Sequence, residues 1–320
     1  MRFLKYILLC AVCTCGLIGC KDNGQSSGND SGSSSGALKV GIMPKLVGIG
    51  YFDACEKGAN EAANELGIDV VFDGPSEAKH DPQVKMMETW ISKGYDVIAV
   101  APNTPDALAP TIAKARQRGI HVMTFDADAD TSEREYFVNQ AENDAVAKTL
   151  LDLVHEAKGP EAKYIVITGD LTADNQVKWR QEIKKYRDAT YPKMTDLRGD
   201  DNPIETKEDR TTAKQKTIDI LDAHPDLDAI LALTSTALPG AAEAVADKNA
   251  GERVFLTGLA LPNEMRQYVK NGAVKKFALW KPVDLGYLTV YAAKLLHEKG
   301  TLGETIDAGR LGEVQIKGDQ

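Results

Sequence analysis

The sequence predicts an α/β fold with two similar lobes, each built on a parallel sheet that helices cover on both faces. Short runs rich in Val and Ile alternate with helical patterns from about residue 37 to residue 299, and this alternation indicates strand–helix–strand units. The series is interrupted at Asp126–Asp130 and then starts again. The folded part, residues 37–320, is long for one lobe and of ordinary length for two.

Four strands and three helices are predicted in the first series. The strands are 37–43, 69–72, 96–101 and 121–125. The helices are 53–66, a helix that Asp81 caps and Pro82 opens, and 105–118, which Gly119 ends. Residues 44–52 form the loop before the first helix, and their two glycines lack the third that a dinucleotide loop needs.

The second series repeats the pattern. The predicted helices are 143–158, one that carries Trp179, 211–223 and 237–247, and the predicted strands are 163–168, 228–233 and 253–257. A helix at 262–271, a strand at 274–280 and a helix at 284–299 follow. Residues 95–100 and 227–232 both read as D-x-I strands after a short turn, as expected if the lobes share a topology.

The last part of the chain is predicted to return across a cleft between the lobes. We therefore assign 37–128 and 259–284 to lobe 1, and 129–258 and 285–320 to lobe 2. Two lobes joined by several crossings form a hinge that can close on a ligand.

The N-terminus has the pattern of a bacterial lipoprotein. A short basic leader precedes Tyr6–Gly19, which is apolar and too short to span a bilayer comfortably. The segment ends Leu-Ile-Gly-Cys at Cys20, which matches the lipobox and predicts cleavage before Cys20 and a lipid on its sulfur. Residues 21–36 are rich in Ser and Gly and predict a flexible tether.

Composition excludes several classes of function. The formal net charge is −9, and the absence of a basic face argues against nucleic-acid binding. Asp126–Asp130 resembles a calcium loop but has Thr131 and Phe137 where glycine and glutamate are needed. The five histidines have no ligand spacing, and no nucleophile motif or phosphate loop is found. We therefore expect no catalytic residues, no metal and no cofactor.

Cys55, the single cysteine after position 20, is predicted to be a buried filler, while Asp128 and Asp130 are predicted to be solvated.

Polar residues follow several predicted strands. Asp126 directly ends one strand, and the others are Lys45, Asn175, Gln176 and Ser235, with Trp280 at the end of a late strand. A hydroxyl-rich ligand needs donors and acceptors on a fixed scaffold and an aromatic face. A charge-assisted hydrogen bond contributes about 1.5–3 kcal/mol, so two of them with several neutral bonds are compatible with micromolar affinity, about −8 kcal/mol.

From Ala37 onward the chain resembles the periplasmic sugar-binding proteins of ABC importers, of the ribose-binding type with two Rossmann-like lobes. Within that group it resembles two families. The autoinducer-2-binding family is matched at Pro44–Gly48, Gly67–Val70, Asp73–Pro75, Thr124–Asp128, Pro225–Ile230, Ala237–Pro239 and Pro262–Arg266. The rhamnose-binding family is matched at Asn175–Trp179, Gly258–Pro262 and Phe277–Tyr287.

The resemblance implies a fold of the type I periplasmic binding protein and a set of ligand-binding residues. Lys45 and Asp126 match polar ligands of the autoinducer-2 site. Its Asp-Gln pair falls on Asn175 and Gln176, and its backbone contacts at a proline and an alanine fall on Leu233 and Ser235. These departures favour a different hydroxyl pattern, such as that of a deoxyhexose like rhamnose.

The resulting expectation is a lipid-anchored, monomeric sugar receptor of an ABC importer on the periplasmic or cell-surface side of a membrane, presenting its closed form to a permease in the cytoplasmic membrane. The lobe 1 side of the site is expected to comprise Lys45, Phe52, Asp126 and Trp280. The families usually continue beyond the position of Gln320, which predicts a truncated or divergent end. Alternatives are an autoinducer-2 receptor, a chemoreceptor-coupled sensor, a sugar-responsive repressor, which would need an N-terminal DNA-binding helix pair, and an enzyme, which would turn the sugar over. Asp126→Ala is expected to abolish binding with nearly unchanged melting.

Overall fold

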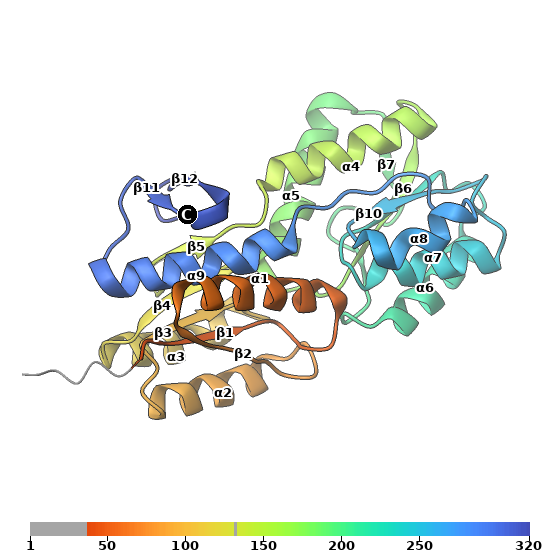
Figure 1. Cartoon of the computed structure of the whole chain (residues 1–320). Helices are drawn as coiled ribbons and strands as arrows, with labels where there is room; N and C mark the ends of the chain where they lie inside the picture. The colour runs from red at the N-terminus through yellow and green to blue at the C-terminus, as the bar shows by residue number, and fades with distance from the viewer. Residues whose placement is uncertain (1–36, 131–132) are drawn as a thin grey trace, which may run out of the picture. The chain divides into compact units, whose positions relative to one another are not determined.

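The computed structural model describes residues 37–130 and 133–320 (Figure 1). The predicted signal peptide, the lipidation site Cys20 and the predicted tether at 21–36 lie outside the described residues. Strands and helices alternate as predicted, and every strand pairing in the two large sheets is parallel. The predicted α/β fold with two lobes is therefore confirmed.

The sheet of lobe 1 has the strand order β2-β1-β3-β4-β5. Its strands are β1 (Lys39–Met43), β2 (Asp69–Phe72), β3 (Val97–Val100), β4 (His121–Phe125) and β5 (Phe137–Val138). Helices α2 (His80–Ser92) and α3 (Pro105–Gln117) cover one face, and α1 (Gly50–Leu66) covers the other. The three inner strands, β1, β3 and β4, are almost completely buried, as expected for a parallel sheet covered on both faces.

Lobe 2 repeats this arrangement with the strand order β10-β9-β6-β7, and β8 also pairs with β6. Its strands are β6 (Lys163–Thr168), β7 (Thr195–Asp196), β8 (Ile204–Glu205), β9 (Ala229–Ala232) and β10 (Phe255–Gly258). Helices α4 (Asn143–Lys158) and α5 (Asp174–Thr190) pack on one face. Helices α6 (Arg210–Ala223), α7 (Ala237–Asp247) and α8 (Pro262–Lys270) pack on the other.

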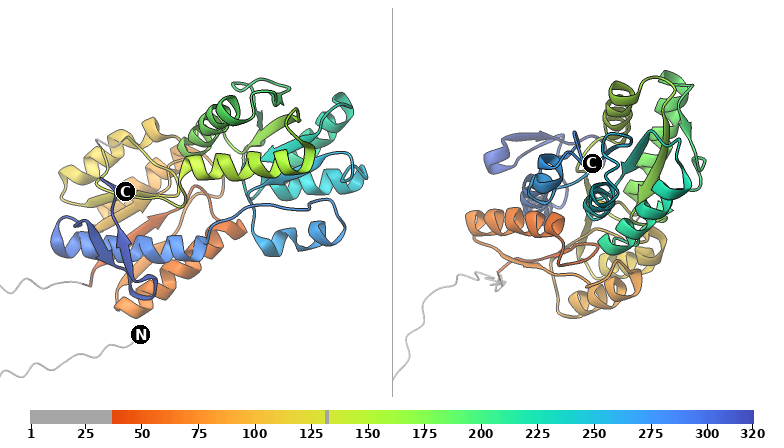
Figure 2. Two further views of the ribbon diagram at one scale, coloured as in Figure 1. Left: turned by 90° about the horizontal axis from the view of Figure 1, so that it is seen from above. Right: turned by 90° about the vertical axis from the view of Figure 1, so that its right-hand side faces the viewer.

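The C-terminal part returns to lobe 1, which corrects the predicted division. Helix α9 (Pro282–Lys299) packs along α1 (Figures 1 and 2). The hairpin of β11 (Thr305–Asp307) and β12 (Glu313–Gln315), with the 3-10 turn η1 (Gly309–Leu311) between them, joins the same core. Residues 285–320 therefore belong to lobe 1 and not to lobe 2, because their apolar side chains complete the α1 face of its sheet.

Two further boundaries of the predicted division are corrected. Helix α8 buries Met265 and Tyr268 in the lobe 2 core, so most of 259–284 belongs to lobe 2. Strand β5 belongs to the lobe 1 sheet, so the first crossing comes after Val138 and not at 128. In the described part of the chain, the lobes are joined by residues 139–142 and by residues 279–281.

Three local predictions also differ from the structure. Residues 274–280 are not a strand, because Ala278 alone pairs, with Leu259, before the chain leaves the sheet. The second helix begins at His80 with Lys79 as its N-cap, so Asp81 is not the cap. The first helix begins at Gly50 and therefore includes Phe52.

Asp128 is not solvated, which is the opposite of what its loop position predicts. It is 2% exposed and accepts hydrogen bonds from Thr124 Oγ1 at 2.6 Å and from Arg134 Nη2 at 2.6 Å. Arg134 also donates to Asp319 Oδ2 at 2.6 Å. The carboxylate is buried because a guanidinium neutralises it and holds the C-terminal residues at the same place. Asp130 is exposed, as predicted.

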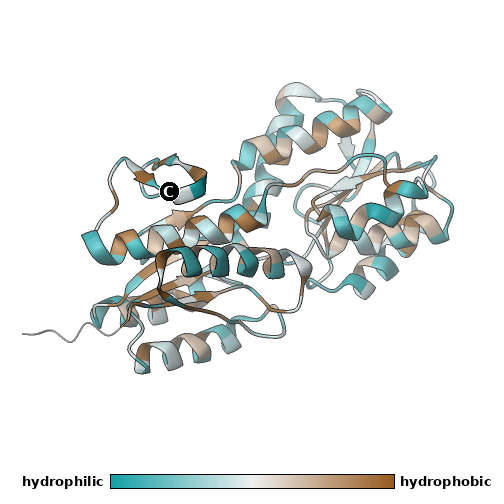
Figure 3. Ribbon diagram, viewed as in Figure 1, coloured by the Kyte–Doolittle hydropathy of each residue, from teal (hydrophilic) through white to brown (hydrophobic). Residues whose placement is uncertain are grey.

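Apolar and polar faces are segregated along the helices, as Figure 3 shows by the alternation of brown and teal. Cys55 is fully buried in the lobe 1 core, in agreement with its predicted role as a filler. Among residues 37–130 and 133–320, none of the helices has both the length and the apolar character needed to cross a bilayer.

Candidate functional site

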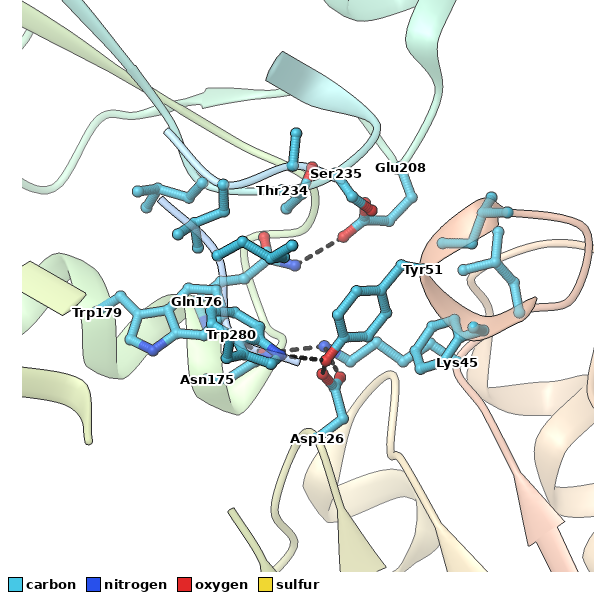
Figure 4. A pocket seen from close by; sticks show the side chains of 17 residues that line it. Lys45, Tyr51, Asp126, Asn175, Gln176, Trp179, Glu208, Thr234, Ser235 and Trp280 are labelled. Carbon is cyan, nitrogen blue, oxygen red and sulfur yellow. Dashed lines mark hydrogen bonds and ion pairs between the residues drawn. The ribbon is translucent and has the colours of Figure 1, made fainter. Parts of the chain in front are cut away.

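A cavity of about 50 Å³ lies where the two lobes meet (Figure 4). It is lined by side chains that follow strands of both sheets. All eight residues predicted from the sequence line it: Lys45, Phe52, Asp126, Asn175, Gln176, Leu233, Ser235 and Trp280.

The sheet topology explains why these residues meet. Lys45 follows β1 and Asp126 follows β4, and the carboxyl ends of parallel strands lie at one edge of a sheet. In lobe 2, Asn175 and Gln176 occupy the first turn of α5 after β6, and Ser235 follows β9. The same edge of each sheet therefore faces the cavity.

A chain of hydrogen-bonded side chains crosses the cavity wall (Figure 4). Trp280 Nε1 donates to Tyr51 Oη at 2.9 Å, and Tyr51 Oη donates to Asp126 Oδ1 at 2.8 Å. Lys45 Nζ lies 3.4 Å from Asp126 Oδ2 and donates to Asn175 Oδ1 at 2.8 Å. The last of these bonds connects lobe 1 directly to lobe 2.

The charged pair in this chain is buried. Lys45 is 4% exposed and Asp126 is 3% exposed. Burial and, second, the Asp126 carboxylate raise the pKa of Tyr51 well above its usual value, so its hydroxyl remains a donor at any physiological pH. Asp126 also has a positive φ of 61°, a conformation that residues other than glycine seldom adopt. The site therefore holds its carboxylate in an unusual backbone conformation.

On the lobe 2 side, Gln176 is held in one orientation. Its Oε1 accepts hydrogen bonds from Thr168 Oγ1 at 2.6 Å, Gly169 N at 2.8 Å and Asp170 N at 2.9 Å. The amide nitrogen Nε2 consequently points the other way and donates to Glu208 Oε1 at 2.7 Å. Gln176 thus offers little acceptor capacity to the cavity.

Aromatic and aliphatic side chains form the rest of the lining. The Trp179 and Trp280 ring centroids are 5.7 Å apart at an angle of 51°, and Tyr51 meets Trp280 edge to face at 6.0 Å. The aliphatic side chains are Leu46, Ile49, Leu233, Leu259, Ala260 and Leu279. Apolar walls with a few fixed polar groups are typical of small-molecule sites.

The sequence did not predict several residues of this lining. Tyr51 is not among the predicted residues because residues 44–52 are predicted to be a loop, although it directly precedes Phe52. Trp179 belongs to the matched motif Asn175–Trp179 but is not predicted to line the site. Glu208 lies in an irregular, highly charged stretch that carries no signal.

The size and the donor set of the cavity limit what can bind. About 50 Å³ is room for a few water molecules, so a larger solute must replace contacts such as that between Lys45 and Asn175. Over residues 37–130 and 133–320, no group of three or more His, Cys, Asp or Glu side chains is placed to hold a metal ion. The arrangement fits a neutral solute with both hydroxyl groups and an apolar face.

A further carboxyl group lies at the contact between the lobes. Glu264 of α8 lies against Gly50, the first residue of α1, where an added Cβ would be 2.7 Å from Glu264 Oε1. The other oxygen, Oε2, is buried without a hydrogen-bond partner. Burial raises the pKa of Glu264, Arg210 opposes this, and Asp53 adds to it. Ionised Glu264 therefore destabilises this contact.

Glu264→Gln is expected to raise the melting temperature at pH 8 and to have a smaller effect at pH 4. A carboxyl group whose pKa is raised in the folded state stabilises the fold at pH values below its ordinary pKa of 4.5. This contribution to stability is lost as the pH rises through the pKa of the folded state. The variant should therefore gain most where the parent is ionised. Differential scanning calorimetry at both pH values measures this, with the exposed Glu304→Gln as the control for net charge. An equal gain at both pH values would show that ionisation is not the cause.

Known proteins resemble this chain both in sequence and in fold. The periplasmic binding protein domain matches residues 40–301. The D-allose-binding periplasmic protein of Escherichia coli (strain K12) is 24% identical over 296 residues, which cover 89% of this chain and 92% of that protein. LsrB from Clostridium saccharobutylicum, solved in complex with AI-2, is 28% identical with a TM-score of 0.83, covering 87% of this chain and 88% of that one. An ABC transporter solute binding protein from Clostridium phytofermentas, solved with bound L-rhamnose, is 28% identical with a TM-score of 0.81, covering 88% of this chain and 90% of that one.

Both families that the sequence resembles are thus represented among the solved structures. The similar proteins are binding proteins and not enzymes, so the prediction that the chain is not an enzyme is confirmed. Since the domain match extends over well over half of the sequence, this chain belongs to the periplasmic binding protein family.

Proposed function

We propose that the protein is the solute-binding component of a sugar ABC importer and that it binds a small monosaccharide in the cavity between its lobes. The observation that carries this proposal is the buried Lys45–Asp126 pair, joined to Tyr51 and Trp280 by hydrogen bonds and facing aromatic rings. A sugar offers hydroxyl groups to the charged pair and a C–H face to the rings.

Among monosaccharides we favour a deoxyhexose such as rhamnose. Asn175 places an amide where a carboxylate is expected from the autoinducer-2 site, and Ser235 adds a hydroxyl to the lining. The aliphatic side chains of Leu233 and Leu259 offer an apolar surface to a methyl group. A relative of similar fold was solved with bound L-rhamnose.

Reception of autoinducer-2 is the second candidate. LsrB from Clostridium saccharobutylicum, which was solved with AI-2, has a TM-score of 0.83 with this chain. Lys45 and Asp126 match the polar ligands that the autoinducer-2-binding resemblance implies. The two candidates differ in which ligand tolerates Asn175 and Ser235.

In this proposal the protein works as a monomer that a lipid on Cys20 holds to a membrane, on its periplasmic or cell-surface side. Ligand entry loosens the contact of Lys45 with Asn175, and closure follows as a shift of population toward the state in which both lobes touch the sugar. The closed form is then the one that a permease recognises. Coupling to a chemoreceptor would use the same residues and differs only in the partner.

L-rhamnose is expected to raise the melting temperature of the chain from Ala37 onward by several degrees at a hundredfold excess over Kd, corresponding to about 2.7 kcal/mol. A thermal-shift screen would compare it with L-fucose, L-lyxose, ribose, galactose and autoinducer-2 in borate-free buffer. A shift with autoinducer-2 alone would replace the favoured sugar with the second candidate. A chain that responds to none of these solutes would contradict both.

A further inference from the structure

Glu208 of lobe 2 lines the cavity, although no sequence pattern predicts a functional residue at this position. It lies between β8 and α6 and lines the cavity opposite the lobe 1 carboxylate of Asp126 (Figure 4). We propose that Glu208 is the second carboxylate of the binding site, which accepts a hydroxyl of the solute, and that Gln176 positions it. The inference rests on the proposed function and assigns a specificity-determining residue to that site.

The backbone around Glu208 is held in a conformation that favours glycine. Among residues 37–130 and 133–320, four non-glycine residues have positive φ: Asp126 at 61°, Lys207 at 56°, Glu208 at 53° and Asn249 at 50°. Two of these are the carboxylates of the cavity lining, and Lys207 directly precedes one of them. Backbone strain of this kind is concentrated where a protein holds a group for a ligand.

Both oxygens of Glu208 are fixed by neutral donors. Gln176 Nε2 donates to Oε1 at 2.7 Å, and Thr236 Oγ1 donates to Oε2 at 2.7 Å. The Oγ1 atom of Thr236 also lies 3.0 Å from Oγ1 of Thr234, within hydrogen-bond distance. Because each carboxylate oxygen can accept more than one hydrogen bond, Glu208 retains capacity for a hydroxyl donor in the cavity.

Gly169 provides the space for this carboxylate. A Cβ at Gly169 would lie 2.0 Å from Glu208 Oε1, so a side chain there would displace it. Gly169 N also holds Gln176 Oε1 at 2.8 Å. The turn after β6 therefore fixes the amide that orients Glu208 and at the same time leaves room for Glu208 itself.

This arrangement changes the role expected of Gln176. Three donors already occupy its Oε1, and its Nε2 is directed at Glu208. Gln176 is thus a positioning residue, and the carboxylate that Asn175 lacks is supplied to lobe 2 by Glu208. Two carboxylates on opposite sides of the cavity favour a neutral polyol and repel a solute that carries its own negative charge.

Isothermal titration calorimetry with L-rhamnose, with autoinducer-2 and with the other sugars of the thermal-shift screen, on the chain from Ala37 onward, tests the proposal. For the ligand that the parent binds, Glu208→Gln is expected to weaken binding about tenfold to a hundredfold, since a charge-assisted hydrogen bond becomes a neutral one. Glu205→Gln removes the same charge from the end of the preceding strand β8, outside the cavity lining, and is expected to bind like the parent. Melting curves verify that each variant is folded.

A double-mutant cycle tests the positioning role. If Gln176 acts through Glu208, Gln176→Leu weakens binding in the parent but adds little in the Glu208→Gln background. Additive losses would overturn the positioning role and make Gln176 a direct ligand contact. Affinity of Glu208→Gln within twofold of the parent would overturn the inference about Glu208 while leaving the sugar-binding function intact. If the parent binds none of the solutes of the thermal-shift screen, the proposed function fails and the inference fails with it.

Discussion

Asp126→Asn is expected to lower the affinity for the bound sugar by at least one order of magnitude and up to several. Asp126 accepts a hydrogen bond from Tyr51 and pairs with Lys45 in a buried site. Truncating one partner of a buried charge pair at a binding site costs about 2–5 kcal/mol, much of it because the other charge is left unpaired. Isothermal titration calorimetry with the ligand found in the thermal-shift screen measures the loss.

The same variant should also melt at a lower temperature, which revises the expectation drawn from the sequence. The sequence predicts nearly unchanged melting for Asp126→Ala, with Asp126 as a ligand-binding residue at the end of a strand. In the structure the carboxylate of Asp126 accepts from Tyr51 and neutralises Lys45, and removing one charge of a buried pair can cost about 3–5 kcal/mol of stability. Alanine would be further disfavoured at a φ of 61°, whereas asparagine tolerates it. Asparagine is therefore the better replacement.

Asp128→Asn is the matched control for Asp126→Asn. Asp128 is equally buried, two residues away, and paired with Arg134, but it does not line the cavity. It should lower the melting temperature and leave the ligand affinity unchanged. If both variants lost affinity to the same extent, the effect of Asp126 would be one of folding and not of ligand contact.

The elements of the fold could be predicted because each strand or helix carries its own periodicity. The parallel strands read as continuous apolar runs, and helices such as α3 are delimited by local residues such as Pro105. Membership of a lobe could not be predicted in this way. It depends on which core a helix enters, and for α9 that is decided by contacts with α1, more than two hundred residues earlier in the chain.

The site was predictable to the extent that it follows the topology. Lys45 follows β1 and Asp126 follows β4 of one parallel sheet, with β3 between them, so the sequence predicts that both lie at the carboxyl edge of that sheet. Glu208 follows a strand of only two residues, β8, in a stretch without periodicity. Tyr51 is a donor in the site only because α1 begins at Gly50. Both positions are set by tertiary contacts that leave no local pattern.

Gly286→Ala is expected to destabilise the protein by several kcal/mol or to prevent folding. An added Cβ at Gly286 would lie 1.9 Å from Cys55 O, and one at Gly58 would lie 1.8 Å from Val283 O. The two helices α1 and α9 therefore meet backbone to backbone at a pair of glycines. Overpacking ordinarily costs about 1–3 kcal/mol, and here the atom in the way is backbone, which cannot rotate aside.

The sign of this effect distinguishes packing from helix propensity. Gly286 and Gly58 both lie inside helices, where alanine is otherwise favoured over glycine by about 1 kcal/mol. Asn60→Ala, on the exposed side of α1, is the control and should be neutral or slightly stabilising. Urea denaturation of the three proteins measures the difference. A stabilised Gly286→Ala would mean that α9 can move away from α1 at little cost.

The first turn of α1 carries Tyr51 and Phe52, and Trp280 lies two residues before the start of α9. A shift of α9 relative to α1 would therefore also move the cavity wall, so a folded Gly286→Ala protein should bind its ligand more weakly than Asn60→Ala.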